Sequence, residues 1–341
     1  MPIAPFPHAS IDTARGGMVT PVAQILSLGA YVPDAVLTNA DLEAMVDTSD
    51  TWIIERTGIR ERRRVAPGET ASAMGERAAR EALARAGNPV PGAIIVATCS
   101  AETPLPSTAC LIQRRLGLGG MPAFDINAAC SGFVYALALS DSLIRSRAVS
   151  TVLVVASEAL TAMTDYTDRS TCVLFGDGAA AAVVGVGEGD GGIRAVRWAA
   201  DGADADLIYF GSRADDPGGP RAIRMAGRGT FRSAVERLAE AAQQLCADAG
   251  WTAADVDWFI PHQANLRIIE ATAKRLGVSM NRVIVNVDRV GNTSAASIPL
   301  AVHEAAASGR LQPGQRIVSV AFGSGVTWGG VALEWTGNPS P

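Results

Sequence analysis

The most reactive side chain at a predicted junction belongs to Cys130, in the stretch FDINAACSGFVYAL (124–137). There a short apolar run gives way to small residues and then to a helical pattern. A thiolate attacks carbonyl carbons, and a helix N-terminus stabilises a thiolate through its unpaired N–H groups and positive partial charge. The small neighbours would let a substrate carbonyl approach closely. A buried structural cysteine is the alternative, because free cysteine is among the most buried residue types.

The chain has only three histidines, and His262 is the one placed where a ligand-binding group would lie. It follows the strand-like run VDWFI and precedes the helical pattern QANLRIIEATAKRLG. In open α/β sheets, ligands bind at the carboxyl ends of strands. His8 lies in a proline-containing N-terminal stretch, and His303 lies within a helical pattern, which indicates packing or a surface position. For His262, an ordinary residue at the start of a helix is the alternative.

Two pairs of segments recur in the same order along the chain, which favours an internal duplication over chance recurrence. One pair reads as a strand, a turn of small residues and a helix start; the other reads as a strand, an FGxG turn and a strand. The pairs are AFDINAACSGFVYALAL (123–139) with IVNVDRVGNTSAASIPLA (284–301), and VLFGDGAAAAVVGV (173–186) with VAFGSGVTWGGVAL (320–333). If the halves pack with pseudo-twofold symmetry, Cys130 and Asn292 face a shared centre.

Strand-like and helix-like runs alternate along the chain, as in an α/β protein. Three runs are apolar throughout, which predicts strands buried on both faces of a sheet: 93–98, 150–157 and 256–261. Helical patterns cover residues 69–87 and 231–250. We expect a flexible extension and two α/β halves, at residues 1–18, 19–190 and 191–341.

Composition limits the classes of function. The 341-residue chain is 48% hydrophobic and 18% charged, which suits a globular enzyme with a large core. Its net charge of −5 gives no reason to expect nucleic acid as a partner, and no run offers the ~18 uncharged apolar residues of a membrane span. The five cysteines form no CxxC pair, so we expect neither a zinc site nor a disulfide framework, and we expect a reducing cytoplasm.

Several stretches between about residues 22 and 335 together resemble the β-ketoacyl-acyl-carrier-protein synthase III family of the thiolase-like superfamily. They are TNADLEAMVDTSDTWIIERTGIRER, AFDINAACSGFVYAL, PHQANLRIIEATAKRLG, GNTSAAS and FGSGVTWG. The resemblance implies a five-layer αβαβα fold with duplicated halves, a homodimer, and no cofactor or metal. It also implies a decarboxylative condensation of an acyl-coenzyme A primer with malonyl-acyl carrier protein, the step that initiates type II fatty acid synthesis.

The resemblance assigns a role to each reactive residue. Cys130 would accept the acyl group, while His262 and Asn292 would hold the thioester oxygen on which negative charge develops after loss of carbon dioxide. Preorganised donors of this kind are each worth ~3 kcal/mol. The oxyanion hole of the first step would use the backbone N–H groups of Cys130 and of Ser324, where glycine is usual in the family.

Further residues would bind coenzyme A. The run TSDTWIIERTGIRERRR holds five arginines, and a charge run of this kind is ordinarily a solvated face. The resemblance instead places Thr48, Trp52 and Arg169 at the adenine and Arg56 near the phosphates. It lines the pantetheine tunnel with Leu207, Met225, Gly227, Phe231, Ala264 and Asn265, for most of which core packing is the alternative.

The acyl pocket and the carrier-protein surface complete the expectations. The resemblance places Leu105, Leu160, Phe175 and Phe322 at the acyl pocket. Leu105 stands where some members carry phenylalanine from the partner subunit, and the smaller side chain either admits longer or branched acyl groups or is compensated by its neighbours. Arg232, Arg267, Lys274 and Arg275 are candidates for docking the acidic carrier protein, with a solvated helix face as the alternative.

Three other functions compete with this interpretation. A related synthase III of secondary metabolism would share every motif. An inactive partner subunit would lack the nucleophile, whereas Cys130, His262 and Asn292 are all present. A thiolase would need a second active cysteine near the C-terminus, and no cysteine follows Cys246.

Overall fold

Two β-sheets form the body of the protein, which a computed structural model describes over residues 21–187 and 191–337. The expected extension, residues 1–18, lies outside the described residues. The first sheet has the order β1 (Ala23–Tyr31), β7 (Asp177–Val186), β6 (Thr151–Ala159), β4 (Ala93–Ala97), β5 (Ala123–Ile126). The second has the order β11 (Trp258–Phe259), β12 (Arg316–Gly323), β13 (Thr327–Glu334), β8 (Gly192–Ala200).

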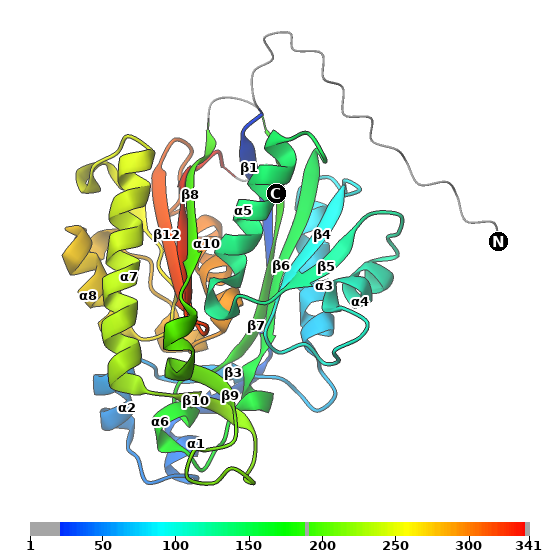
Figure 1. Ribbon diagram of the computed structural model, residues 1–341. Helices are drawn as coiled ribbons and strands as arrows, with labels where there is room; N and C mark the ends of the chain where they lie inside the picture. The colour runs from blue at the N-terminus through cyan, green and yellow to red at the C-terminus, as the bar shows by residue number, and fades with distance from the viewer. Residues whose placement is uncertain (1–20, 188–190, 338–341) are drawn as a thin grey trace, which may run out of the picture.

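Helices alternate with these sheets in five layers, which cross Figure 1 from left to right. The second sheet is covered on its outer face by α7 (Gly227–Asp248), on which α8 (Leu266–Leu276) packs. Between the sheets lie α5 (Gly132–Arg145) and α10 (Ser297–Ala307). The outer face of the first sheet is covered by α3 (Ala71–Arg85), with α4 (Thr108–Leu116) beside it. This arrangement confirms the predicted αβαβα fold.

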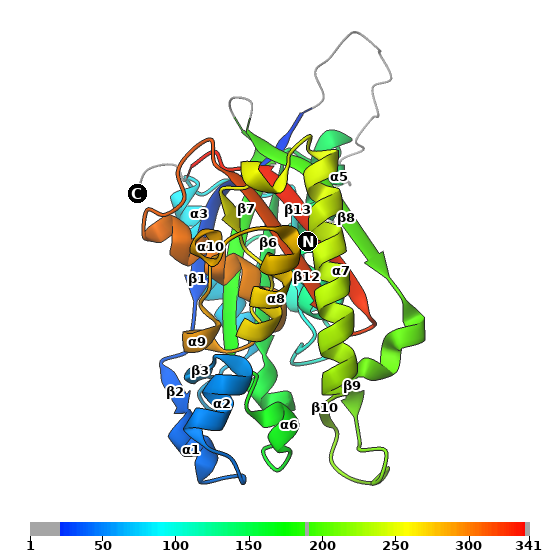
Figure 2. The ribbon, with the colours of Figure 1, turned by 90° about the vertical axis from the view of Figure 1, so that its left-hand side faces the viewer.

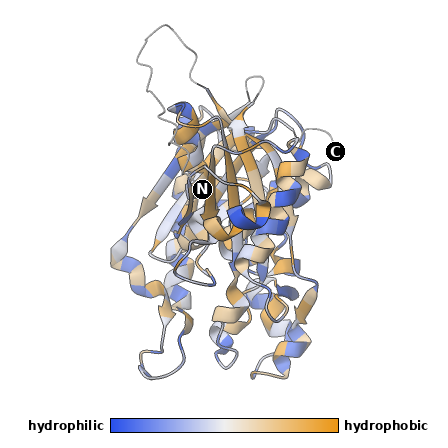
Figure 3. Ribbon diagram, turned by 90° about the vertical axis from the view of Figure 1, so that its right-hand side faces the viewer, coloured by the Kyte–Doolittle hydropathy of each residue, from blue (hydrophilic) through white to orange (hydrophobic). Residues whose placement is uncertain are grey.

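The apolar pattern explains the central strands. Every residue of β4 is buried, and the interior strands are hydrophobic along their lengths in Figure 3. Of the predicted strand at 256–261, only Trp258 and Phe259 form β11. The chain nevertheless continues beside β12, because the N–H groups of Ile260 and His262 donate to the carbonyls of Val318 and Val320. This pairing places His262 at the carboxyl end of the sheet.

The two sheets share one pattern of strand directions. In each, a parallel pair (β4 with β6, β11 with β12) is followed by two antiparallel neighbours (β7 and β1, β13 and β8). The junctions ahead of α5 and α10 also match. Each begins with a residue at positive φ, Ala129 at 46° and Ser294 at 48°, and continues as a 3₁₀ turn, η1 (Ala129–Ser131) or η6 (Ser294–Ala296).

The two FGxG segments differ, and the expectation of a strand ahead of both is wrong. The FGSG segment closes a hairpin between β12 and β13. Residues 173–176 form no strand, because their backbone groups pair with the other junction instead. The N–H of Asn292 donates to the carbonyl of Leu174 at 2.8 Å, and the N–H of Gly176 donates to the carbonyl of Asn292 at 3.0 Å. This pairing anchors the Asn292 turn to the first half of the chain.

Smaller elements gather at the end of the molecule that lies lowest in Figure 1. Figure 2 shows that the hairpins β2–β3 and β9–β10 lie at this end with α1, α2 and α6. Their bounds are β2 (Ala35–Thr38), α1 (Asn39–Glu43), α2 (Asp50–Thr57), β3 (Glu61–Arg64), α6 (Arg169–Cys172), β9 (Ile208–Gly211) and β10 (Ala222–Met225). The remaining short helices are η2 (Leu160–Met163), η3 (Gly202–Leu207), η4 (Ala253–Asp255), η5 (Met280–Arg282) and α9 (Val287–Val290).

Arg62 corrects the view of the arginine run as a solvated face. Its side chain is fully buried, donates to the carbonyl of Val173 at 3.2 and 2.5 Å, and donates to Oδ1 of Asn39 at 2.6 Å. Burial lowers its pKa to about 10, so the guanidinium is still charged at neutral pH. The buried cation is compensated by these acceptors, which tie β3 to the segment beside Asn292.

Replacing Arg62 with alanine is therefore expected to destabilise the fold. The change leaves the Val173 carbonyl without its donor and removes buried side-chain volume, at a combined cost of about 2–4 kcal/mol in the free energy of unfolding. Urea titration followed by circular dichroism measures the difference. The exposed Arg60 provides the control, and Arg60→Ala is expected to change the same quantity by less than about 0.5 kcal/mol. Equal effects of both changes would contradict this assignment.

Candidate active site

Cys130, His262 and Asn292 line one cavity of about 230 Å³. Cys130 lies in η1, His262 follows β11, and Asn292 precedes η6. Cys130 also lines a second cavity of about 200 Å³, so its side chain stands where the two meet. The larger cavity extends from these residues to Trp52 and Arg56. The structure thus brings the three residues singled out in the sequence to one place, from both halves of the chain.

The side chain of Asn292 has a defined orientation. Its Oδ1 accepts a hydrogen bond from the N–H of Ser294 at 2.9 Å, and the residue is only 6% exposed. Because a backbone N–H is always a donor, the amide oxygen must face it, and the amide nitrogen faces the other way. Asn127, at the matching position of the first junction, accepts from the N–H of Ala129 in the same manner. Asn292 thus offers its NH₂ group as a donor.

His262 is a neutral, buried imidazole. Its Nδ1 lies 2.6 Å from Oγ of Ser297, and the residue is 4% exposed. Burial disfavours the charged ring and lowers the pKa of His262 to about 3. A neutral imidazole carries one N–H, so the ring can act as a hydrogen-bond donor without being an acid at neutral pH.

If His262 holds the thioester oxygen, as the family resemblance implies, this pKa predicts how the transfer of the acyl group from Cys130 to the malonyl substrate depends on pH. A lowered pKa means that the ring is uncharged at every pH well above 3, so no histidine titration is expected between pH 5.5 and 8. Discharge of preformed acyl-enzyme by the extender substrate, followed in single turnovers, is expected to vary less than about twofold over this range. An inflection near the ordinary histidine pKa of ~6.5 would contradict the buried, neutral ring.

The thiol of Cys130 is protonated in the protein by itself. Burial raises the pKa of Cys130 to about 12; the Ser294 hydroxyl opposes this rise, and the buried Glu158 carboxyl adds to it. Burial therefore outweighs the helix N-terminus that the sequence suggested would favour a thiolate. To act as the predicted nucleophile, Cys130 must lose its proton when a substrate binds.

The FGSG turn lies directly against the backbone of Cys130. A Cβ added to Gly323 would lie 2.7 Å from the Cys130 nitrogen, so only glycine permits this approach. Ser324 follows and lines the smaller cavity, with its hydroxyl donating to the carbonyl of Ile208 at 2.5 Å. The position predicted for the second oxyanion donor therefore borders the cavity that contains the thiol.

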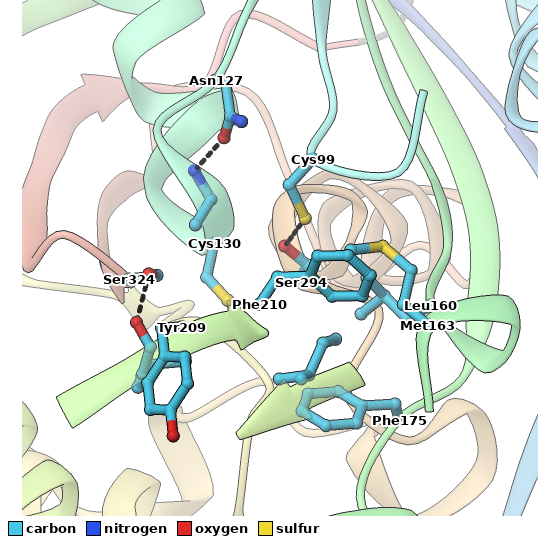
Figure 4. A pocket seen from close by; sticks show the side chains of 13 residues that line it. Cys99, Asn127, Cys130, Leu160, Met163, Phe175, Tyr209, Phe210, Ser294 and Ser324 are labelled. Carbon is cyan, nitrogen blue, oxygen red and sulfur yellow. Dashed lines mark hydrogen bonds between the residues drawn. The ribbon is translucent and has the colours of Figure 1, made fainter. Parts of the chain in front are cut away.

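The smaller cavity is largely apolar and is drawn in Figure 4. Leu160 and Phe175 line it, whereas Phe322 lines the larger cavity. Leu105 lies outside both cavities of its own chain and is 85% exposed. Some residues that line this cavity were not predicted from the sequence. Among them are Met163 from η2, Phe210 from the β9–β10 hairpin and Cys99 from the turn after β4.

Cys99 places a second thiol in the same cavity. Its Sγ lies 3.5 Å from both carboxylate oxygens of Glu158 and 3.8 Å from Oγ of Ser294. Burial, together with the Glu158 carboxyl, raises the pKa of Cys99 well above its ordinary value. Cys99 is therefore held as a neutral thiol beside Cys130.

Five of the predicted tunnel residues line the larger cavity: Met225, Gly227, Phe231, Ala264 and Asn265. Leu207 does not, and its neighbour Ile208 takes that place. Asn265 also has a structural role, because its Oδ1 caps α8 by accepting from the N–H of Arg267 at 2.9 Å and its NH₂ donates to the carbonyl of Arg56 at 3.0 Å.

Trp52 and Arg169, the two side chains predicted to hold the adenine, are in contact with each other. The guanidinium carbon of Arg169 lies 5.0 Å from the centre of the Trp52 ring, and its Nη1 donates to the carbonyl of Asp47 at 2.7 Å. The two groups are in direct contact, so a base enters between them only if Arg169 moves. Thr48 lies outside the lining of the cavity, and its Oγ1 is buried without a hydrogen-bond partner in the described structure.

The candidate docking residues are exposed on the outer helices. Arg232 lies on α7, and Arg267, Lys274 and Arg275 lie on α8. The guanidinium carbon of Arg267 lies 5.7 Å from the centre of the Phe231 ring, which lines the larger cavity. Arg267 therefore lies beside that cavity.

The sequence of this chain matches a known protein family. The model of the family described as 3-oxoacyl-[acyl-carrier-protein (ACP)] synthase III matches residues 124–202, and the model of its C-terminal part matches residues 246–335. The β-ketoacyl-[acyl-carrier-protein] synthase III of Shigella dysenteriae serotype 1 is 49% identical over 316 residues, which cover 92% of this chain and 99% of that protein. The chain belongs to the β-ketoacyl-acyl-carrier-protein synthase III family.

Other known proteins are similar to this chain in sequence and in fold. The Escherichia coli K12 protein is 48% identical over 316 residues, 92% of this chain and 99% of that one. The crystal structure from Aquifex aeolicus VF5 matches with a TM-score of 0.87 and 45% identity over 92% of this chain and 100% of that one. The priming β-ketosynthase of the R1128 polyketide pathway matches with a TM-score of 0.88 and 36% identity over 95% and 100%.

Two kinds of structural feature are absent from the described residues. Over residues 21–187 and 191–337, no helix has both the length and the apolar character needed to cross a membrane. In the same part of the chain, His, Cys, Asp and Glu side chains do not gather in groups of three or more that could hold a metal ion.

Proposed function

We propose that this synthase III condenses an acyl-coenzyme A primer with malonyl-acyl carrier protein and so initiates type II fatty acid synthesis. The products are β-ketoacyl-acyl carrier protein, coenzyme A and carbon dioxide. The observation that carries the proposal is the single cavity that holds Cys130, His262 and Asn292, with a path to Trp52. The family relatives at 48–49% identity support the fatty acid role over a role in secondary metabolism.

In the first half-reaction, Cys130 loses its proton and its sulfur attacks the acyl carbonyl. The N–H groups of Cys130 and Ser324 stabilise the oxyanion, and coenzyme A leaves as a thiolate that takes up a proton. The apolar cavity lined by Leu160, Phe175 and their neighbours receives the acyl chain. Splitting the reaction in this way predicts ping-pong kinetics.

In the second half-reaction, the malonyl group loses carbon dioxide and leaves an enolate at the thioester carbonyl. The N–H of His262 and the NH₂ of Asn292 donate to its oxygen, and both are neutral donors, so neither presents the readily transferred proton of an imidazolium to the carbanion. The enolate carbon attacks the acyl carbonyl, the bond to Cys130 breaks, and the Cys130 thiolate takes up a proton from solvent, which restores the thiol. No step requires a metal or a cofactor.

Coenzyme A and carrier protein reach the thiol through the larger cavity. We assign the adenine to the Trp52 ring, with Arg169 swinging away from it, and the phosphates to the side of Arg56. The pantetheine lies along Met225, Gly227, Phe231 and Ala264. The acidic carrier protein docks on Arg232, Arg267, Lys274 and Arg275, which are exposed and form no ion pair with a carboxylate among the described residues.

The active unit that we propose is a cytoplasmic homodimer of chains with halves at residues 19–190 and 191–341. The exposed Leu105 favours the dimer, because only a second copy can bring it to an acyl cavity. The buried free thiols Cys172 and Cys246 are compatible with a reducing compartment.

Leu105 provides a test of the acyl pocket. If the partner's copy closes the pocket, Leu105→Phe is expected to shift the preference toward short primers, with kcat/KM for longer or branched acyl-coenzyme A falling about tenfold, a loss of about 1.4 kcal/mol. Initial rates with a panel of acyl chain lengths measure the shift. An unchanged profile would show that this position does not set the depth of the pocket.

The proposed reaction is tested with purified protein, an acyl-coenzyme A panel and malonyl-acyl carrier protein. We expect carbon dioxide release and β-ketoacyl-acyl carrier protein in equal amounts, both dependent on the primer. Decarboxylation without any condensed product, with every primer, would overturn the proposal.

A further inference from the structure

The hydrogen bond that holds His262 comes from a residue with no assigned role. Ser297 is the first residue of α10, is fully buried, and has its Oγ 2.6 Å from Nδ1 of His262. The same Oγ accepts a longer hydrogen bond from the N–H of Gln263 at 3.4 Å. The hydroxyl does not cap its helix, because Ala296 is the N-cap and makes no side-chain capping bond.

The position of one proton follows from these contacts. A serine hydroxyl has one hydrogen and two lone pairs, and the N–H of Gln263 is directed at a lone pair. Nδ1 of His262 is the only acceptor that a described hydrogen bond offers to the hydroxyl hydrogen. The hydrogen therefore points at Nδ1, which must be unprotonated. The single proton of the neutral ring is then on Nε2.

We propose that Ser297 is a positioning residue that holds His262 in the Nε2–H tautomer, with the donor directed at the substrate oxygen. The inference rests on the proposed function, in which His262 stabilises an enolate. With the proton on Nδ1 instead, Nε2 would present a lone pair to that oxygen and repel it. An Nε2 that already carries hydrogen also cannot accept the Cys130 proton, so His262 serves the second half-reaction alone.

The surrounding contacts leave the ring little other freedom. Gln263 is fully buried; its Nε2 donates to the carbonyls of Pro261 and Ile284 at 2.7 and 3.1 Å, and its Oε1 accepts from the N–H of Asn286 at 3.0 Å. These bonds fix the backbone on both sides of His262. With the backbone fixed, the imidazole ring can still rotate and can still exchange between its two tautomers. The hydrogen bond from the Ser297 hydroxyl restricts both.

The matching position of the first junction shows that the two halves differ here. Three residues after Ala129 stands Gly132, as Ser297 stands three after Ser294. A Cβ added to Gly132 would lie 2.9 Å from Cβ of Ala97 and 3.3 Å from Cβ of Ala295, so a serine does not fit there. Each junction therefore carries one reactive feature: the thiol in the first half, the orienting hydroxyl in the second.

The tautomer is directly measurable by ¹⁵N NMR. The chain has three histidines, so ¹⁵N-histidine labelling gives a simple spectrum, and the His262 signals are those that His262→Gln removes. Protonated and unprotonated ring nitrogens resonate in separate ranges. We expect wild-type His262 to show a protonated Nε2 and a bare Nδ1 at pH 7, and Ser297→Ala to show a mixture of the two tautomers. A protonated Nδ1 in the wild type, or an unchanged Nε2–H form in Ser297→Ala, would overturn the inference.

Rate measurements on Ser297→Ala and on a matched control variant distinguish a loss of His262 orientation from a loss of protein stability. In Ser297→Ala, discharge of acyl-Cys130 by malonyl-acyl carrier protein is expected to slow about 10- to 100-fold, the usual effect of removing a group that orients a functional histidine. Acylation of Cys130 is expected to keep its rate. The control is Ser319→Ala, which removes another buried hydroxyl, bonded to the carbonyl of Ile260 at 2.8 Å, and is expected to leave both the tautomer and the discharge rate unchanged.

Failure of this inference is distinguishable from failure of the proposed function. If wild-type protein discharges normally and Ser297→Ala discharges equally fast, Ser297 does not position the ring, and the proposed reaction stands. If wild-type protein never forms acyl-Cys130, the proposed function fails, whatever tautomer the spectrum shows. Equal slowing of acylation and discharge in Ser297→Ala would indicate a purely structural role and would also overturn the inference.

Discussion

Cys130→Ser is expected to abolish condensation, with kcat falling about 10⁴-fold or more, because a serine hydroxyl is far less ionised than a thiol and no general base contacts it. The site-specific labelling by iodoacetamide is expected to disappear with the thiol. The variant should fold normally, since the substitution exchanges sulfur for oxygen at the same position. Steady-state rates and peptide mapping after alkylation measure the two effects.

Cys99→Ser is the matched control for this change. Cys99 lines the same cavity, and burial raises its pKa as it raises that of Cys130. Cys99 lies in the turn after β4, however, whereas the FGSG turn lies against the backbone of Cys130, so we expect only Cys130 to have oxyanion donors and to act as the nucleophile. The Cys99 variant is expected to accept acyl groups at a rate within about threefold of the wild-type rate. Rapid alkylation or acylation retained in Cys130→Ser and lost in Cys99→Ser would show that the nucleophile has been assigned to the wrong sulfur.

Asn292→Asp is expected to block condensation while leaving acylation intact. The aspartate keeps the oxygen that accepts from the N–H of Ser294, so the junction is preserved, but it replaces the donor by a charged acceptor. The loss in the discharge rate is expected to exceed the 10²–10³-fold typical of deleting one oxyanion donor, since the carboxylate also repels the enolate. Single-turnover discharge of acyl-enzyme by malonyl-acyl carrier protein measures it.

His262→Ala removes the other donor and provides an independent check. Its discharge rate is expected to fall about 10²–10³-fold with acylation of Cys130 unchanged. If both variants acylated slowly but discharged normally, the two residues would belong to the first half-reaction, contrary to the roles assigned here. Normal condensation by either variant would remove that residue from the mechanism.

The sequence could single out Cys130, Asn292 and His262 as candidates because their positions follow from local patterns. Cys130 and Asn292 stand at strand-to-helix junctions that recur in the chain, and His262 stands at the end of an apolar run. The duplication then predicts that the junctions meet, and the geometry bears out this convergence. Long apolar strands and capped helices such as α3 are likewise set by nearby residues.

Other features depend on tertiary contacts, which local sequence patterns do not predict. The Ser297–His262 hydrogen bond joins residues 35 positions apart, and nothing in SIPLAVHEAAA marks the first serine as its donor. The burial that raises the pKa of Cys130 depends on the packing of the cavity walls as a whole. The burial of Arg62 depends on the carbonyl of Val173, 111 positions away, whereas the charge run by itself predicts a solvated face.

The central claim, that Cys130 carries the acyl group at a site completed by His262 and Asn292, is tested most directly by intact-mass analysis. The protein is incubated with a panel of acyl-coenzyme A thioesters, measured, and measured again after addition of malonyl-acyl carrier protein. We expect a mass increase of one acyl group, which maps to the Cys130 peptide. Adding malonyl-acyl carrier protein is expected to remove this increase. No adduct with any primer, or an adduct that maps to another residue or persists after the extender is added, would contradict the central claim.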